Sequence, residues 1–196
     1  KHILTQNNPY RHHIKCFRRY IDDIFMIWEG SLKAFIQYVH EAQSALKFTA
    51  TWNEKEITFL DLIIKHEEGR LITILYRKET DKNSLLEYRS FHPRSLRDGL
   101  PYGQFLRISR NCSKKEDYFK EAQLLKQRLI ERGYPKGLVR RALKRAWYNP
   151  REEILKKKQK HSNRRTVCVM TFNPHTNKVT NIIKKYWKLI RHLGEL

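Results

Sequence analysis

The sequence is poor in glycine and cysteine and lacks any long hydrophobic run. Only 7 of its 196 residues are glycine, and none forms the glycine-rich loop of P-loop nucleotidases, so that class is excluded. The cysteines at positions 16, 112 and 168 lack paired spacing. This excludes a disulfide scaffold or a zinc module and favours a reducing compartment. No apolar run approaches the roughly 20 residues of a transmembrane helix, so a membrane protein is excluded.

The first residues give further exclusions. The chain begins at Lys1, and nothing there has the pattern of a signal peptide. We therefore expect an intracellular protein, nuclear or cytoplasmic and not secreted, and a piece of a longer one. His12, His13 and Cys16 lie close together, but no second pair of ligands stands at zinc spacing, so we expect no metal there.

Positive charge is concentrated in the later part of the chain. The net charge is +21, from 41 Lys+Arg against 20 Asp+Glu. Residues 1–68 hold nine basic and nine acidic residues, so residues 69–196 carry the whole excess. This asymmetry predicts two functional regions, of which the second binds a polyanion with release of counterions. The alternative is a solvated basic face without a partner, which self-repulsion makes costly.

Residues 15–80 have the pattern of β-hairpins with one helix. The runs KCFRRYI and IFMIW flank Asp22-Asp23, which predicts a tight hairpin. Ser31 is a suitable N-cap for a helix that ends near residue 46. Strands are expected over 48–52, 57–65 and 70–78, the last two joined by a turn at Glu68-Gly69.

Helices dominate after Asp81. Ser113-Lys-Lys-Glu116 has the form of a capping box and predicts the start of a helix that Gly133 ends. A second apolar stripe begins after Tyr134-Pro135-Lys136, which gives a helix-turn-helix pattern, a weak sign of DNA reading because helical hairpins are common. Further on we expect a basic linker over 155–165, a short strand over 166–172 and an amphipathic helix over 177–193.

The most informative motif is Tyr20-Ile21-Asp22-Asp23, between two apolar runs. A hairpin turn projects adjacent carboxylates from a ribbon whose buried strands hold them, and the two acids repel each other unless a cation neutralises them. Divalent cations such as Mg²⁺ take oxygen ligands, and nucleotidyl transfer uses two such ions held by carboxylates. The alternative is that Asp stands here only because it favours turns.

FRRYIDDIFMIW resembles the two-aspartate palm motif of reverse transcriptases, and the residues after it resemble one branch of them, the Penelope-like retroelements of animal genomes. The resemblance spans most of residues 15–190 in the family's order. Its later stretches are ITFLDLIIKHEEGRLITILYRKETDKNSLL, SFHPRSLRDGLPYGQFLRISRNCS and, more weakly, TFNPHTNKVTNIIKKYWKLI. The first resembles the later palm strands and the hairpin that grips the primer. The second, with the helices after it, resembles the thumb, labelled a helix-turn-helix domain in animal retroelement proteins.

Together, pattern and resemblance predict an α+β fold. A partial antiparallel palm sheet with a packed helix (1–80) precedes an α-helical thumb with a helix-turn-helix (81–150), and a basic linker with a short strand and terminal helix comes last (151–196). The resemblance implies RNA-directed DNA polymerase chemistry on an RNA template and a DNA primer. It implies a two-metal Mg²⁺ site in which Asp22 and Asp23 are catalytic ligands, with Tyr20 near the primer end.

Several departures qualify this expectation. In the family, the fingers and the other catalytic aspartate of the palm precede the segment that corresponds to Lys1, so the metal site is incomplete here, and the nuclease domain of some members is absent. Glu79 and Glu87 stand where the family usually has Pro and His, as in a drifted genomic copy. We therefore expect the chain alone to be inactive as a polymerase.

The family's Phe-Leu-Asp-Leu string falls on residues 59–62. We expect Phe59 and Leu60 to pack in the core, and Asp61 to be either functional or paired with Arg77 or Lys78 across the hairpin. Aromatic residues at apolar helical spacing are more often core than base-stacking platforms, which is our expectation for Tyr102, Phe105 and Trp147.

Basic residues recur at helical spacing in the thumb-like region, where they are expected to contact phosphates without reading sequence. They are Arg107, Arg110, Lys126, Arg128, Arg132, Arg140, Arg141, Lys144 and Arg145. Two functions therefore stay open. One is a reverse-transcriptase fragment whose thumb holds a template–primer, and the other is a non-catalytic helix-turn-helix module that binds nucleic acid.

Overall fold

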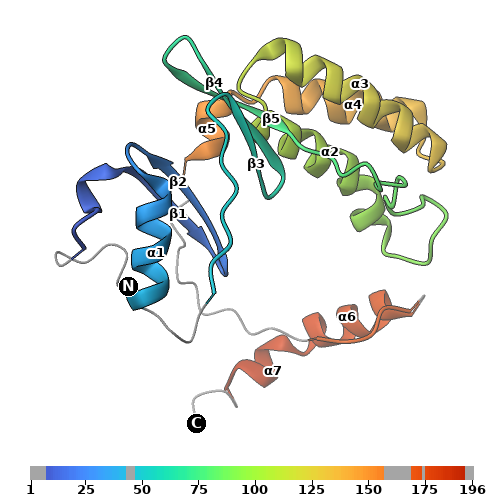
Figure 1. Ribbon diagram of the computed structural model, residues 1–196. Helices are drawn as coiled ribbons and strands as arrows, with labels where there is room; N and C mark the ends of the chain where they lie inside the picture. The colour runs from blue at the N-terminus through green and yellow to red at the C-terminus, as the bar shows by residue number, and fades with distance from the viewer. Residues whose placement is uncertain (1–7, 43–46, 157–168, 174, 193–196) are drawn as a thin grey trace. The chain divides into compact units, whose positions relative to one another are not determined.

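Two small antiparallel sheets and a series of helices make up the computed structural model (Figure 1). It describes residues 8–42, 47–156, 169–173 and 175–192. The chain divides into two compact units, Lys1–Arg77 with both sheets and Lys78–Leu196 with most of the helices. The mixed α+β class predicted from the sequence is confirmed. Within the described residues, no helix is long and apolar enough to cross a membrane.

The first sheet is a hairpin of β1 (Ile14–Tyr20) and β2 (Asp23–Trp28), which comes after a single 3-10 turn, η2 (Arg11–His13). Tyr20 pairs with Asp23, so the turn residues are Ile21-Asp22, one position earlier than expected. Ile21 has a φ of 53°, the sign that the first turn residue of both common hairpin turns requires. The strands are half-exposed, so the expectation of buried strands on both sides of the carboxylates is wrong.

Helix α1 (Leu32–Ala42) packs against this hairpin, as its apolar stripe predicts. The rings of Trp28 and Phe35 lie 4.5 Å apart, and Phe35 and Val39 are buried. The predicted continuation to residue 46 lies outside the described residues.

The second sheet is a meander of β3 (Glu56–Phe59), β4 (Leu62–Glu67) and β5 (Arg70–Leu75). The predicted turn at Glu68-Gly69 is confirmed, with φ of 48° and 74°, because a type I′ turn needs positive φ at both residues. The single strand expected over 57–65 is wrong, since the chain reverses at Leu60-Asp61 and Phe59 pairs with Leu62.

Two expectations about apolar residues of this unit are also wrong. Leu60 lies in the turn with 43% of its surface exposed, outside the core. Residues 48–52 form no strand. Apolar and branched residues form a strand only where a neighbouring strand accepts their hydrogen bonds, and none of the described strands pairs with this segment.

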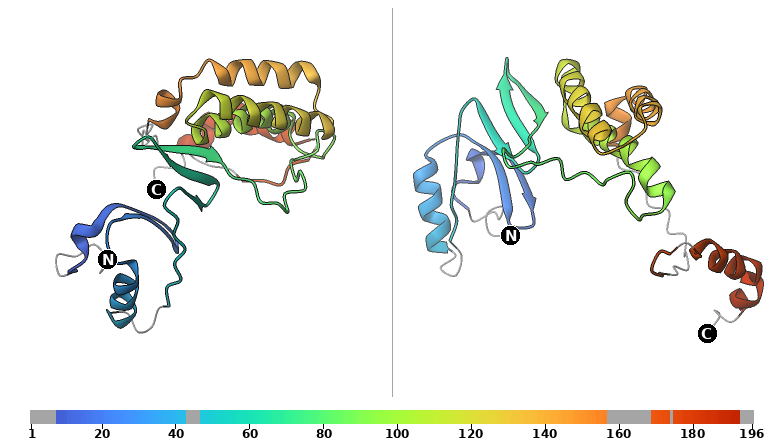
Figure 2. Two further views of the ribbon diagram at one scale, coloured as in Figure 1. Left: turned by 45° about the horizontal axis from the view of Figure 1, so that its top comes forward. Right: turned by 90° about the vertical axis from the view of Figure 1, so that its right-hand side faces the viewer.

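The second unit is built on α2 (Arg94–Asn111), α3 (Lys115–Glu131) and α4 (Lys136–Trp147), with the short α5 (Arg151–Leu155) after them. Helix α2 packs against both α3 and α4 (Figures 1 and 2). The largest fully buried side chains come from all three helices: Phe105, Ile108, Leu129, Val139 and Pro101. The expectation that Phe105 belongs to the core is confirmed.

Gly133 ends α3, as predicted. Its φ is 80°, its N–H donates to the carbonyl of Ile130 at 2.9 Å, and the N–H of Tyr134 donates to Leu129 at 3.1 Å. These two bonds define a Schellman motif. The N-cap of α3 is Lys114, so the helix begins one residue later than the capping box at Ser113 predicts.

The last elements differ from the single helix expected over 177–193. Helices α6 (Thr176–Lys185) and α7 (Trp187–His192) are separated at Tyr186, the C-cap of α6. Residues 169–172 form no strand, while 166–168 and most of the expected basic linker (157–165) lie outside the described residues.

Replacing Gly133 by alanine should destabilise the helical unit by about 1–2 kcal/mol, because a left-handed conformation is unfavourable for a residue with a side chain. The cost is conformational, since a Cβ at Gly133 would only make an ordinary 3.9 Å contact with Tyr88. Urea denaturation monitored by circular dichroism measures it. The matched control is Gly103→Ala inside α2, where a Cβ meets open space and should add about 0.5–1 kcal/mol. Equal denaturation midpoints for the two variants would contradict this account.

Candidate nucleic-acid interface

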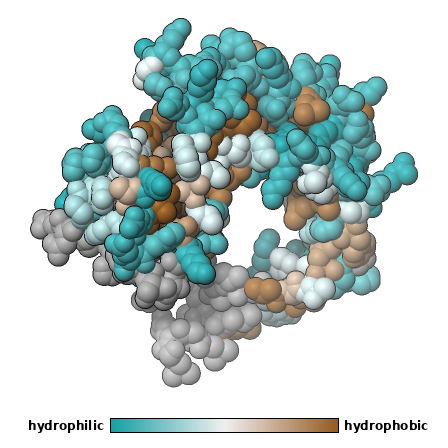
Figure 3. Space-filling model, in the orientation of Figure 1, coloured by the Kyte–Doolittle hydropathy of each residue, from teal (hydrophilic) through white to brown (hydrophobic). Residues whose placement is uncertain are grey.

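Helix α4 buries one side and exposes cations on the other. Val139, Ala142 and Ala146 are its buried residues. A helix turns 100° per residue, so the side opposite them is occupied by basic residues, all of them exposed. We define the α4 basic face by these residues: Arg140, Arg141, Lys144 and Arg145. Hydrophilic residues cover most of the surface over α3 on the side shown in Figure 3.

Arg145 is positioned by α2. Its guanidinium carbon lies 4.1 Å from the centre of the Tyr102 ring, a cation–π contact. The Asn149 side-chain amide donates to the Tyr102 hydroxyl at 3.3 Å and to the Arg145 carbonyl at 2.7 Å. Tyr102 therefore has a structural role in joining α2 to α4, which agrees with its expected place in the fold.

Helix α2 adds Arg107 and Arg110, both exposed. The carbonyl of Arg110 accepts a hydrogen bond of 3.1 Å from Nε of Arg151, the first residue of α5. The guanidinium of Arg151 thus lies at the C-terminal end of α2. On α3, Lys126 is exposed as well.

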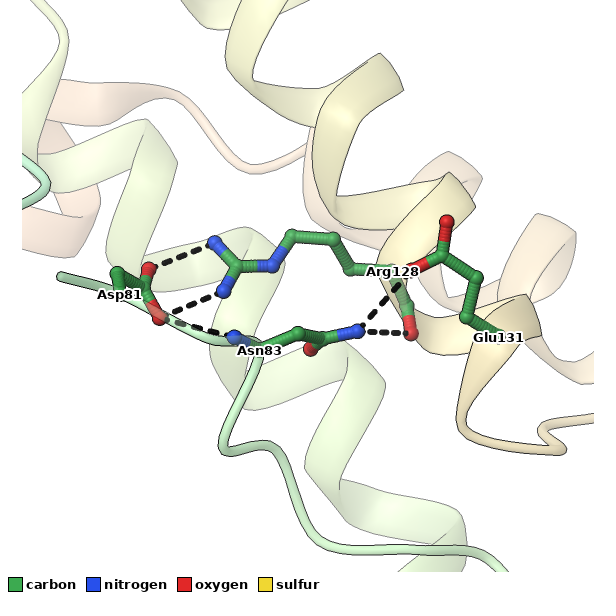
Figure 4. A network of polar contacts seen from close by, with 4 residues as sticks. All are labelled: Asp81, Asn83, Arg128 and Glu131. Atoms are coloured by element: carbon green, nitrogen blue, oxygen red, sulfur yellow. Dashed lines mark hydrogen bonds and ion pairs between the residues drawn. The ribbon is translucent and has the colours of Figure 1, made fainter. Parts of the chain in front are cut away.

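Arg128 differs from the other predicted contact residues because it is engaged within the chain. Its two terminal nitrogens donate to the two carboxylate oxygens of Asp81 at 2.7 and 2.6 Å (Figure 4). This hydrogen-bonded pair raises the pKa of the Arg128 guanidinium, and only 11% of its side chain is exposed. The guanidinium of Arg128 is therefore engaged by Asp81 and is less available to a phosphate than the α4 cations.

The residues around this pair fasten the segment before α2 to α3. The side-chain amide of Asn83 donates to the Arg128 carbonyl at 3.1 Å and to Glu131 at 3.2 Å. The N–H of Tyr88 donates to the Arg132 carbonyl at 2.9 Å. Arg132 is half-buried at this junction and is also less available to a ligand than the α4 residues. We call residues 81–92 the α3 strap.

Two tyrosines of the core keep their protons at neutral pH. Burial raises the pKa of Tyr118 to about 12 and also raises the pKa of Tyr134. Neither tyrosine adds negative charge to the helical unit, so the core does not reduce the positive charge of the α4 basic face.

Asp22 and Asp23 lie at the tip of the first hairpin, and both are exposed. The guanidinium Nε of Arg19 donates to the Ile21 carbonyl at 2.7 Å and so closes the turn without pairing with either acid. Tyr20 stands opposite Asp23 and is exposed. Nowhere in the described residues do three or more His, Cys, Asp or Glu side chains gather as metal ligands. Two adjacent carboxylates alone do not complete the set of ligands that a divalent ion takes, so the described residues hold no full metal site at this hairpin.

Residues 84–144 match the model of a family described as the animal helix-turn-helix domain. This stretch is a helix-turn-helix domain. It covers most of the α3 strap, α2, α3 and most of α4, and it confirms the helix-turn-helix predicted within 81–150. Nothing in the match names a reverse transcriptase. No curated protein and no solved structure matches the chain.

The helix-turn-helix domain has a four-residue turn between α3 and α4, residues 132–135, which contains Gly133. The opposite ends of these helices also meet, since the rings of Tyr118 and Trp147 lie 5.4 Å apart. Helices α3 and α4 therefore run antiparallel and side by side (Figure 2). In DNA-reading helix-turn-helix proteins the two helices cross at about 90–120°. Here α3 accompanies α4 along its length, and the α4 basic face is the part left open.

The Asp81–Arg128 pair joins residues 47 positions apart in the sequence, so no local pattern could have predicted it. Changing Asp81 to Asn should destabilise the helix-turn-helix domain by about 1–3 kcal/mol, because it leaves a largely buried guanidinium without its counter-ion. Chemical denaturation of the variant measures this loss. The control is Glu153→Gln, which removes an exposed partner of Lys156 and should cost under about 0.5 kcal/mol. A loss for Asp81→Asn no larger than that of the control would contradict the assigned role.

Proposed function

We propose that this chain binds nucleic acid through the α4 basic face and contacts phosphates without reading base sequence. The observation that carries this proposal is the row of exposed cations on a helix whose other side is buried in a helix-turn-helix domain. Such residues neutralise phosphates and release counterions, which supplies affinity but no sequence information.

The antiparallel arrangement of α3 and α4 supports contact with the backbone. A recognition helix that reads bases lies in the major groove, with its N-terminal residues at the base edges. The cations of α4 instead extend from Arg140 to Arg145, near the C-terminal end of the helix. This distribution suits the outside of a duplex. The resemblance to Penelope-like reverse transcriptases makes an RNA template paired with a DNA primer the duplex to test first.

Removing the charges of Arg140, Arg141 and Lys144 by alanine substitution should weaken duplex binding and flatten its salt dependence. Each lost phosphate contact lowers the slope of log affinity against log salt by about 0.9. Fluorescence anisotropy with an RNA–DNA duplex at several salt concentrations measures both quantities.

The control for this experiment removes the same charge elsewhere. Lys33, Lys47 and Arg70 are exposed cations of the first unit, and their alanine variant carries the same net charge as the α4 variant. We expect its salt slope to equal that of the unchanged protein. Equal loss in both variants would mean that overall charge, and not the α4 basic face, accounts for binding.

A second function is favoured by the first hairpin, whose tip carries two exposed carboxylates with no ion pair to any described residue. We infer that Asp22 and Asp23 contribute ligands to a divalent-metal site of a reverse-transcriptase palm, with Asp22 and Asp23 as its catalytic residues and Tyr20 beside the primer. This inference is supported by the hairpin and the family resemblance, and it requires a further carboxylate from outside the described residues.

Binding of Mn²⁺, a paramagnetic substitute for Mg²⁺, tests this second function. We expect Mn²⁺ to broaden amide NMR signals around residues 21–23 at lower concentration than elsewhere, because two adjacent carboxylates attract a divalent cation. The double variant Asp22→Asn, Asp23→Asn should lose this broadening, whereas Glu67→Gln and Glu68→Gln at the other exposed hairpin should not affect it. Broadening of equal strength at both hairpins would refute a specific site.

A further inference from the structure

An exposed aromatic surface lies at the end of the α3–α4 hairpin. The rings of Phe119 and Trp147 have centroids 4.7 Å apart and are tilted by 34°. Half of the surface of Phe119 and 40% of that of Trp147 are open to solvent, so the expectation that Trp147 belongs to the core is wrong. Beneath them lies the buried Tyr118, in contact with both. We call Phe119 and Trp147 the aromatic platform. It rests on the core and so presents its rings in a fixed orientation.

The platform continues the α4 basic face. Arg140 and Lys144 precede Trp147 by seven and three residues, so all three lie on one side of α4. With a rise of 1.5 Å per residue, the two cations are spaced about 10 and 4.5 Å along the axis from the indole. On α3, Lys115 and Glu116 lie one turn before Phe119, and their opposite charges cancel. The cations on the same side of α4 as Trp147 are therefore Arg140 and Lys144.

We propose that this surface holds a single-stranded segment of nucleic acid, with an unpaired base stacked on the aromatic platform and its phosphates on Arg140 and Lys144. The proposal rests on the proposed function of the α4 basic face and specifies its ligand. Aromatic rings beside a basic groove are how proteins hold single strands, because every base has a face that stacks and every linkage carries a charge.

The phosphates of a duplex suit the α4 basic face, but its bases cannot use the aromatic platform, since they are already stacked on one another and present only their edges. An apolar protein segment would cover the rings but would leave the neighbouring cations without counter-charges. A single strand satisfies both parts of the surface at once. The ligand expected here is thus the unpaired part of a template or primer next to the duplex.

Two oligonucleotides of equal length and charge separate stacking from phosphate contact. One is oligodeoxythymidylate and the other is an abasic oligodeoxyribose phosphate that lacks every base. We expect the protein to bind the first about tenfold more tightly than the second, which corresponds to one stacked base. Trp147→Leu should bring this ratio close to one and leave the affinity for the abasic oligomer unchanged.

Two further variants distinguish a loss of base stacking from a folding defect. Trp147→Phe keeps an aromatic ring and should retain most of the preference, whereas Phe119→Leu changes the more exposed ring and should reduce it. Equal affinity for both oligomers, or an unchanged ratio in Trp147→Leu, overturns the aromatic platform while the α4 basic face stands. If neither oligomer nor duplex binds, the proposed function itself fails.

Discussion

Burial of one side of α4 against α2 and α3 is the constraint on which the helical unit depends. Burial of Val139, Ala142 and Ala146 places the opposite side of α4 in solvent. The residues on that opposite side are nearly all basic. Each large apolar side chain buried in this core contributes about 1.5–3 kcal/mol, enough to hold several like charges on one exposed face. Packing therefore decides the electrostatics of the surface.

Two features keep this arrangement in place. The Schellman motif at Gly133 reverses the chain, so that α4 returns along α3 and their far ends meet at Trp147. The α3 strap is fastened by the Asp81–Arg128 pair and by hydrogen bonds of Asn83 and Tyr88. The family match begins at residue 84, within the strap and ahead of the first helix of the domain.

The hairpin tip of the first unit and the α4 basic face of the second carry opposite charges. The first unit offers two carboxylates at the tip of a half-exposed hairpin, and the second offers a row of cations with two aromatic rings at its end. A template–primer would use both kinds of site, the cations for its backbone and the carboxylates through a metal ion. A binding module would need the second unit alone, and that unit is the one whose family match is established.

How far the fold can be predicted from the sequence depends on whether the information is local. Glu68-Gly69 and Gly133 were predicted correctly because positive φ is a property of one or two residues. The strand expected at 48–52 was wrong because a strand needs a partner strand. The single strand expected over 57–65 was wrong because the chain reverses at Leu60-Asp61, a turn that contains no glycine by which it could be predicted. The start of α3 was predicted one residue too early, because Ser113 has the residue type of an N-cap but Lys114 takes that position.

The sequence by itself determined the excess of positive charge after residue 68, the helical periodicity that separates cations from apolar residues on α4, and the adjacent carboxylates of the first hairpin. Only the tertiary structure decided which of these charges are available. It paired Arg128 with Asp81, placed Arg145 over Tyr102 and left Trp147 half open beside Phe119, in contacts between residues 28 to 47 positions apart. Such pairs form because helices pack in three dimensions, and a local pattern carries no record of which side chains that packing brings together.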